Sequence, residues 1–387
     1  MAHTRLDSWK SIAEYLDRSV RSVQRWHVEY GLPVFHLRGD KGSVFAYPDQ
    51  LDNWLLDRGA TQIHHEEEEL LVRSKVLSER LITAAQERLL LASEENLLKI
   101  AMLYRRAAEL DPRNPFALTE LSKVLIYSAI CGSAQAVAAY ADAGALLSAA
   151  SRLNVHSTEA KCVSAWLSMM LVRDWNNARA QFNAILVSQP KHPLTLLGSG
   201  LLHLAEGDLA AASSHLVSAW SEDPLNSITA SLACWGHYLS GEYDRAIGLI
   251  ARLRARGDSG RILTTLEALT IIQLGSPHDC ISHLEGLTAD QPDNKVLSGV
   301  LGYAYGVSGM SDKARSASSN FLGKRANGDG NDAYPMALTS LGLGQTQGAI
   351  HWIEESIKER SVWSLGLRFD PLLVPLRREA EFESLLR

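Results

Sequence analysis

The sequence predicts a mainly α-helical chain, in which a small winged helix-turn-helix head is followed by an α-solenoid of repeated helix pairs. Two observations carry this prediction. Residues 6–56 hold two short helical patterns followed by strand-like runs, and landmark residues further along recur every 34 positions. The chain of 387 residues is long enough for a head and a repeat array, and its apolar content of 46% is that of a globular protein.

Two short helices open the head. Ser8 and Ser19 each precede an apolar pattern with helical spacing, and a serine hydroxyl in that place accepts a backbone N–H that the first turn leaves unpaired. The expected inward residues are Trp9, Ile12, Ala13 and Leu16 in the first helix, and Val20, Val23 and Trp26 in the second. The second helix then turns a basic and polar face outward, made of Arg21, Ser22, Gln24 and Arg25. Two short helices joined by a tight turn predict a helix-turn-helix.

A hairpin is expected after the second helix, because Gly31-Leu32-Pro33 ends that helix. Residues 34–37 and 43–47 are rich in β-branched and aromatic side chains, and a glycine-containing stretch lies between them. A hairpin beside a helix-turn-helix forms a wing, which places Arg38 and Lys41 at its tip. A closing helix follows from Pro48.

The run W-x-x-I-A-x-Y-L-x-R-S-V-R-S-V-Q-R-W from Trp9 to Trp26 is followed by G-L-P-V and G-S-V-F-A-Y. Together these motifs resemble the winged helix-turn-helix of MerR and excisionase-like bacterial regulators, over about the first 58 residues. The resemblance implies a DNA-binding domain at residues 1–58 that binds double-stranded DNA, with the second helix in the major groove.

Within such a head, Arg21, Ser22 and Arg25 would read bases with help from Gln24, because Arg and Gln form paired hydrogen bonds with base edges. The residues expected to contact phosphate and set the register are Arg18, Ser19, Arg38 and Lys41. About five phosphate contacts, at roughly −0.9 in log K each, make the binding of one head weak and salt-sensitive. We therefore expect a homodimer on DNA.

Charge supports only a local basic surface. Residues 1–58 hold eight Lys or Arg and eight Asp or Glu, so the net charge of −6 falls on the rest of the chain. The net charge of −6 argues against a protein coated in nucleic acid. A protein-interaction module with buried aromatic residues remains an alternative interpretation of the head.

The helical pattern lapses at residues 59–69, where we expect a polar linker. This stretch includes His64-His65 before four glutamates. Adjacent residues of a helix do not share a face, and no partner at ligand spacing is evident, so the pattern favours a solvated linker over a metal site.

Residues 70–387 are predicted to form the array. Ends of helix pairs recur at Pro190, Pro224, Asp258, Pro292 and Ala326. Small residues recur at Ala178, Ala212, Ala246, Cys280 and Ala314, and turn glycines at Gly207, Gly241, Gly275 and Gly309. Large apolar residues recur at Phe182, Leu216, Ile250 and Leu284, and Ser318 breaks this row. The steric reason is that close helix packing needs a small side chain and a tight turn suits glycine.

A step of 34 residues is the period of the tetratricopeptide repeat (TPR), and the stretch from Tyr104 to Pro112 resembles the end of one such unit. We expect seven to eight helix pairs, with an insertion near Cys131-Gly132-Ser133. A short polar-faced cap, containing Phe369-Asp370-Pro371 and residues 382–386, is expected at the C-terminal end.

By resemblance, TPR arrays bind proteins or peptides in a groove lined by the first helix of each pair. Here the first-helix positions include His203, Tyr238 and Tyr305. Such residues also serve packing between repeats, so we assign no binding residue to the array.

The sequence offers no motif for enzyme chemistry. It contains neither a Gly-x-x-x-x-Gly-Lys-[Ser/Thr] phosphate loop nor a His-Glu-x-x-His zinc motif. Gly257-Asp258-Ser259-Gly260 is similar to the loop around a serine-protease nucleophile, but it falls between repeats, and we interpret it as a turn. We therefore expect no catalytic residue, no metal site and no cofactor.

The expected compartment is the cytoplasm. The first ten residues have no apolar core of a secretory signal, and no run approaches the roughly 20 apolar residues of a membrane helix, so no membrane partner is expected. The four cysteines, Cys131, Cys162, Cys234 and Cys280, lie far apart in the chain, as is typical of small buried side chains in a reducing compartment.

The leading hypothesis is a bacterial-type transcriptional regulator whose head binds DNA and whose array binds a partner protein or peptide, or mediates self-association. The alternative is a TPR interaction scaffold whose head no longer binds DNA. A peptide-responsive regulator of the quorum-sensing kind shares the broad plan, but that kind typically carries a different helix-turn-helix without this wing.

Overall fold

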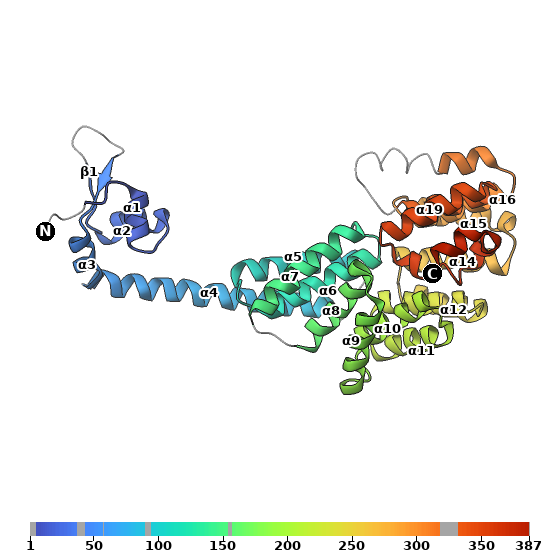
Figure 1. Cartoon of the computed structure of the whole chain (residues 1–387), viewed down its shortest axis with the longest axis horizontal. Helices are drawn as coiled ribbons and strands as arrows, with labels where there is room; N and C mark the ends of the chain where they lie inside the picture. Colours follow the sequence, from blue (N-terminus) through green and yellow to red (C-terminus); the bar gives the residue numbers. More distant parts are fainter. Residues whose placement is uncertain are drawn as a thin grey trace. The chain divides into compact units, whose positions relative to one another are not determined.

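The computed structural model describes residues 5–36, 43–56, 58–89, 94–153, 157–317 and 332–386, with the backbone alone for residues 58–67 and Glu95. The chain divides into two compact units, Met1–Leu77 and Ser78–Arg387. Helices dominate both units, and Figure 1 shows those of the second unit stacked as a solenoid. The predicted fold class, a mainly α chain with a small winged head and a TPR-type α-solenoid, is confirmed.

Two capped helices open the head. Helix α1 (Trp9–Tyr15) begins after Ser8, whose hydroxyl accepts the N–H of Ser11. Helix α2 (Val20–Tyr30) begins after Ser19, whose hydroxyl accepts the N–H of Ser22. Both predicted caps are confirmed.

The head has its own small core, to which both helices and the hairpin contribute. The fully buried apolar residues are Ile12, Ala13, Val23, Trp26, Leu32, Val34, Val44, Ala46 and Leu51. Trp9 and Trp54 pack against this core, as expected of structural tryptophans. Val20 was expected to face inward, but its side chain is 38% exposed. Val20 is the first residue of α2 and lies at the turn, before the part of the helix that is buried.

The predicted hairpin is present but short. Strands β1 (Phe35–His36) and β2 (Val44–Phe45) pair antiparallel, with Phe35 opposite Phe45. Leu6 adds an isolated bridge to Ala46, and α3 (Pro48–Leu56) closes the head.

The stretch 59–69 lies within a helix. Helix α4 (Arg58–Leu89) runs continuously through it for 32 residues, and the boundary between the two compact units falls inside this helix. Glutamate is a good helix former, so a charged run without Gly or Pro in its interior extends a helix as readily as it forms a loop. The domain limits expected from the sequence, 1–58, 59–69 and 70–387, remain a prediction.

Beyond α4 the helices follow one another in pairs. The first helices of the pairs are α6 (Pro115–Ile130), α8 (Thr158–Leu167) with the π-helical turn η1 (Ser168–Val172), α10 (Pro193–Glu206), α12 (Ser227–Leu239), α14 (Arg261–Leu274), α16 (Lys295–Val307) and α18 (Ala333–Gly342). The second helices are α5 (Glu94–Leu110), α7 (Ala136–Arg152), α9 (Trp175–Ser188), α11 (Leu209–Glu222), α13 (Tyr243–Ala255), α15 (Pro277–Asp290) and α19 (Thr346–Lys358). Helix α5 has the second half of α4 as its partner, since the Ser78 hydroxyl donates to the Ala107 carbonyl at 2.9 Å.

The first helices are the inner layer. Eleven of the thirteen residues of α12 are buried, whereas α11 buries only three. This difference means that other helices pack around a first helix on several sides, whereas a second helix is buried along one face only.

The rows of the 34-residue period have the expected roles. Every residue of the small row is buried, as is every residue of the large apolar row that the structure describes. Gly207, Gly241 and Gly309 adopt left-handed backbone angles at the turns. Gly275 differs: it is extended, because Ser276 and Pro277 begin the next helix directly.

The extra length near residue 132 is distributed rather than inserted at one place. Helices α6 and α7 have 16 and 17 residues, whereas α10 and α11 have 14 each, and a turn at residues 131–135 joins the longer pair. Gly132 holds a left-handed conformation in that turn. The insertion was therefore predicted at the correct turn. Most of the remaining extra length of this repeat lies in its two longer helices.

The C-terminal segment differs from the expected polar cap. Two 3-10 helices, η2 (Val362–Leu365) and η3 (Pro371–Arg378), and helix α20 (Ala380–Leu385) lie among the helices of the array (Figure 1). The Trp363 ring meets the Trp235 ring of α12 edge-on at 5.3 Å and stacks on Tyr334 of α18 at 5.8 Å. Asp370 accepts hydrogen bonds from the hydroxyls of Tyr238 and Tyr334. This segment therefore fills space inside the array instead of covering its end.

Candidate functional site

The outer face of α2 is the first candidate. Arg21 and Gln24 are exposed on α2, Arg25 of the same helix is half-buried, and Arg18 is exposed in the turn before it. Arg21 and Gln24 are three positions apart, so they share one face of α2 and can meet neighbouring base edges.

The two serines of this helix are engaged locally. The Ser19 hydroxyl caps α2, and the Ser19 and Ser22 hydroxyls lie 2.9 Å apart. Ser22 therefore holds the start of the helix, and its use for base reading would compete with that contact.

Two arginines are partly committed within the head. The Arg18 guanidinium lies 5.9 Å from the Trp26 ring and donates to the Asp17 carbonyl at 2.9 Å. Arg25 forms a loose ion pair with Glu29, at 3.8 Å, and its Nε is buried. Arg21 has no such engagement among the described residues, which makes it the least restrained cation of the helix.

The wing contributes aromatic rather than basic side chains in the part that the structure describes. Phe35 is 40% exposed and stacks on Phe45 at 5.4 Å, and the Arg5 guanidinium lies 4.8 Å above the Phe45 ring. Arg38 and Lys41 lie outside the described residues. Arg5 was missed at the sequence level, since the bridge between Leu6 and Ala46 that brings it to the wing has no local signal.

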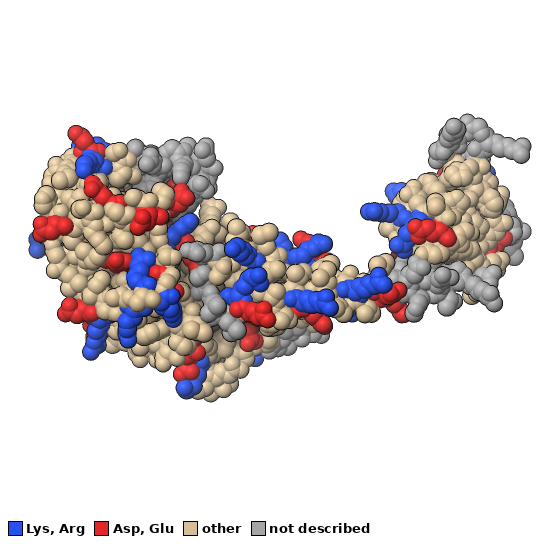
Figure 2. Space-filling model, turned by 180° about the vertical axis from the view of Figure 1, so that it is seen from behind, with Lys and Arg blue, Asp and Glu red and all other residues tan. Residues whose placement is uncertain are grey.

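Charges are mixed on the visible surface. Figure 2 shows basic and acidic side chains interspersed over the face it displays, with no broad area of one sign. On this face, electrostatic attraction to a polyanion would therefore come from scattered cations and not from one basic area.

The second candidate is a pocket of about 480 Å³ in the array. It lies where the N-terminal ends of α6, α8, α10 and α12 come together, beside the end of α4. Its apolar lining includes Leu89, Phe116 and Leu194, and Phe116 is 41% exposed. A pocket of this size holds one or two side chains of a bound segment.

The polar lining of this pocket is mainly acidic. Glu120 is buried and pairs with Lys123 at 2.6 Å, while Glu159 has no ion-pair partner in the described part of the chain. Burial raises the pKa of Asp223, whose carboxylate accepts from the Asn226 amide at 3.0 Å. The excess of carboxylates favours a basic group on any bound segment.

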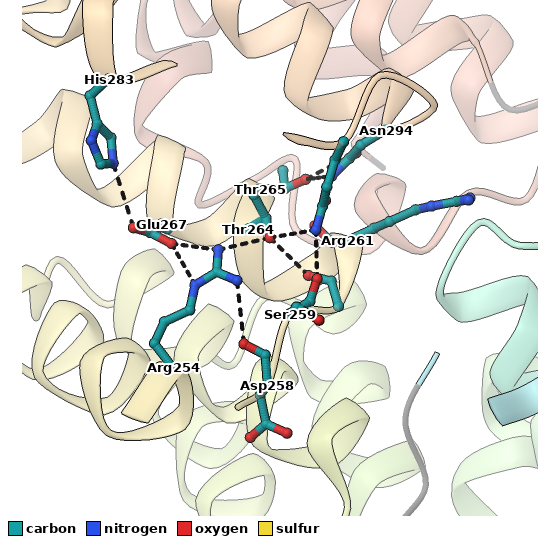
Figure 3. A network of polar contacts seen from close by, with 11 residues as sticks. Arg254, Asp258, Ser259, Arg261, Thr264, Thr265, Glu267, His283 and Asn294 are labelled. Atoms are coloured by element: carbon teal, nitrogen blue, oxygen red, sulfur yellow. Dashed lines mark hydrogen bonds and ion pairs between the residues drawn. The ribbon is translucent and has the colours of Figure 1, made fainter. Parts of the chain in front are cut away.

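The loop at residues 257–260 is a structural turn. Arg254 of α13 donates two hydrogen bonds to Glu267 of α14 and one to the Asp258 carbonyl (Figure 3). Gln291 donates to the Ser259 carbonyl, so the loop is anchored from both sides. Figure 3 shows His283 directed at Glu267, with a separation of 3.5 Å, and not at Ser259. The interpretation as a turn fits this network.

The inner tyrosines and histidine have packing roles. The Tyr238 hydroxyl is used by Asp370, and that of Tyr305 donates to Glu285 at 2.6 Å. His203 meets the His215 ring edge-on at 5.2 Å. The four cysteines are buried and unpaired, as the sequence predicts. Among the described residues, no three His, Cys, Asp or Glu side chains are grouped closely enough to hold a metal ion.

No family model and no curated protein matches the sequence. Several solved structures are similar in fold. A chain from the Cut9–Hcn1 hetero-tetramer of APC/C is 16% identical, with a TM-score of 0.50, over 79% of this chain and 54% of that one. A tetratricopeptide repeat protein from Parabacteroides merdae is 16% identical over 69% of this chain and 98% of its own, with a TM-score of 0.44. The TPR domain of P58(IPK) is 15% identical over 80% and 99%, with a TM-score of 0.25.

The Cut9–Hcn1 likeness, together with the helix pairs and the 34-residue period, shows that the array has the TPR-type solenoid fold. The resemblance of the head to MerR and excisionase-like domains has no counterpart in these comparisons and remains a prediction. Within the described part of the chain, every helix is too short or too polar to cross a membrane.

Proposed function

We propose that the array is a protein-interaction scaffold, which holds a segment of a partner protein in the pocket at the N-terminal ends of α6, α8, α10 and α12. The observation that carries this proposal is the pocket itself, since its lining comes from four successive helix pairs and combines exposed Phe116 with carboxylates. Because acidic side chains dominate its polar lining, the preferred segment carries an apolar side chain next to a lysine or arginine.

A displayed library of random peptides, selected against the full chain, tests this proposal. Selected peptides should share a basic and an apolar position, and Phe116→Ala or Glu159→Lys should weaken their binding by about tenfold or more in fluorescence anisotropy. Val187→Ala is the matched control, because Val187 is 87% exposed on α9 and lies outside the pocket. Peptides that bind all four proteins equally would place the interaction elsewhere.

We further propose that the head binds double-stranded DNA and that the chain is a transcriptional regulator. The observation that favours this second function is the capped α1–α2 pair with Arg21 and Gln24 exposed on one face of α2. In this proposal Arg21, Gln24 and Arg25 read bases, with Ser22 close by. Arg18, Ser19, Arg38 and Lys41 contact phosphate.

A titration of the full chain with the DNA upstream of its own gene tests this second function. Arg21→Ala should lower the discrimination between this DNA and unrelated DNA, by roughly 1–3 kcal/mol. Arg18→Ala should weaken both equally and reduce the salt slope by about one. Lys10→Ala, on the exposed side of α1, should leave both values unchanged. Absence of binding even at low salt would leave the scaffold function alone.

We also propose that two copies act together, because a single head offers few phosphate contacts. Analytical ultracentrifugation with and without DNA measures this. A chain that stays monomeric on saturating DNA would contradict the homodimer.

A further inference from the structure

An arginine holds a turn that glycine holds in the next repeats. Arg173 follows η1 and lies 34 residues before Gly207 and 68 before Gly241. All three adopt left-handed backbone angles, with a φ of 64° at Arg173. A side chain makes this conformation less favourable than it is for glycine, so the turn itself gives no reason for an arginine at this position.

The Arg173 side chain runs into the array toward the C-terminal segment. Its guanidinium lies 5.1 Å from the Trp175 ring. One terminal nitrogen makes two long hydrogen bonds, at 3.4 Å to the Ile357 carbonyl and at 3.3 Å to the Ser364 hydroxyl. The Nε atom is buried without a hydrogen-bond partner. A guanidinium in a protein interior normally donates paired hydrogen bonds from its planar fork to an anion. The contacts of Arg173 with the described residues include no anion.

A second arginine adds to the positive charge. Arg360 lies between Ile357 and Ser364, and it too adopts a left-handed conformation, with a φ of 58°. Burial, and then the charge of Arg360, lowers the pKa of Arg173 to about 10. Among the described residues, no Asp or Glu forms an ion pair with either arginine.

A buried phenol completes the group. Tyr140 of α7 is 0% exposed, and its hydroxyl has no hydrogen-bond partner. Helix α7 packs against η1, the turn that Arg173 follows, and the positive charge of Arg173 acts to lower the pKa of Tyr140. A buried hydroxyl donor without a partner is costly in a protein interior unless a bound acceptor, such as an anion, satisfies it.

We propose that Arg173 and Arg360, with Tyr140 beside them, form a binding site for an oxyanion group, either a phosphate or a carboxylate. The anion would accept from both guanidinium groups and neutralise their mutual repulsion. It would also tie the turn after η1 to the C-terminal segment, which lies about 190 residues further along the chain. Neither the scaffold function nor DNA binding is needed for this inference.

Thermal unfolding of the full chain, in phosphate and in chloride of equal ionic strength, tests the site. About 50 mM phosphate should raise the unfolding temperature of the wild type by about 3 °C or more relative to chloride. Acetate is the second arm: a rise in acetate alone assigns the site to carboxylates, and a rise in phosphate alone assigns it to phosphates.

Arg173→Gly is the decisive variant, because glycine already holds this turn in neighbouring repeats and the fold should be retained. Arg173→Gly and Arg360→Ala should each abolish the anion-dependent rise. Arg152→Ala, an exposed arginine of α7, should keep it. An equal rise in all four proteins, or no rise in the wild type with either anion, would overturn the proposal.

Discussion

At the scale of single residues, the buried carboxylate of Asp370 joins three parts of the array. It accepts from the Tyr238 hydroxyl of α12 at 3.3 Å, from the Tyr334 hydroxyl of α18, and from the Leu372 N–H at 3.0 Å. Burial raises the pKa of Asp370 above its ordinary value, although these hydrogen bonds act in the opposite direction. The carboxyl group therefore binds its proton more tightly in the folded chain than in the unfolded chain.

The raised pKa of Asp370 predicts the sign of a pH dependence. Where the folded state holds more protons than the unfolded state, the free energy of unfolding falls as pH rises. The contribution of Asp370 is therefore favourable in acid and is lost as pH rises from the unfolded to the folded pKa. Each tenfold difference in proton affinity between the two states corresponds to about 1.4 kcal/mol. Asp370→Asn should remove this decline, as measured by urea unfolding between pH 4 and pH 8.

The control for this experiment is Asp312→Asn, at a fully exposed carboxylate, which should keep the wild-type pH profile. Parallel profiles for Asp370→Asn and the wild type would mean that the buried carboxyl does not titrate differently on folding.

At the scale of elements, the close approach of α16 and α18 depends on glycine. A Cβ at Gly306 would lie 2.6 Å from the Gly342 carbonyl oxygen and 2.8 Å from the Leu343 nitrogen. Backbone atoms cannot move aside as a flexible side chain can. We expect Gly306→Ala to lower the free energy of unfolding by about 1–3 kcal/mol through overpacking, as measured by chemical denaturation.

Gly286→Ala is the matched control. Gly286 lies inside α15, and a Cβ there would meet nothing within 4 Å. Alanine should stabilise that helix by roughly 0.5–1 kcal/mol, because it restricts the unfolded chain and suits a helix. The same sign for both substitutions would refute the role of close approach.

Elements with a local signal could be predicted from the sequence. Ser8 and Ser19 predict the start of their helices because a cap acts within four residues. The small row at Ala178 and Ala212 predicts a close helix contact that is repeated in successive pairs. The exposure of Val20 could not be predicted. The spacing of apolar residues shows which face of α2 is apolar, but it does not show how far along the helix the packing partner extends. The base-reading roles also stay predictions. The exposure of Arg21 follows from its place on α2, whereas base recognition depends on the DNA that it would contact.

At the scale of the whole molecule, the C-terminal segment joins repeats that are not neighbours. Trp363 packs against both α12 and α18, and Arg173 reaches the segment from the third repeat. Glu94 of α5 also pairs with Arg261 of α14 at 3.0 Å. A simple repeat array unfolds through nearest-neighbour terms, whereas these contacts couple distant repeats.

This coupling predicts the effect of Trp363→Ala. Loss of the buried indole should cost about 3–5 kcal/mol. Hydrogen exchange should show α12 and α18 losing protection together, since both pack on the same ring. Val374→Ala, at a half-exposed position of η3, should leave both helices protected. Protection lost in α18 alone would show that the repeats unfold independently.

The place of this segment could not be predicted from the sequence. Residues 361–379 lack helical periodicity, and the partners of Asp370 lie on helices far away in the chain. Phe369 and Asp370 look like cap residues locally, whereas their burial depends on a cavity that only the stacked repeats create. The repeat period describes contacts between adjacent repeats, so it cannot predict a contact between distant ones.

Tyr238 and Asp370 are 132 positions apart in the chain, so they are also synthesised at different times. A ribosome adds about 5–20 residues per second, so α12 leaves it roughly ten seconds before Asp370 is made. During that interval the indole of Trp235 and the phenol of Tyr238 lack their contacts with Trp363 and Asp370, because those residues have not yet been synthesised. The contacts that α12 makes with the C-terminal segment can therefore form only after the last part of the chain has been translated.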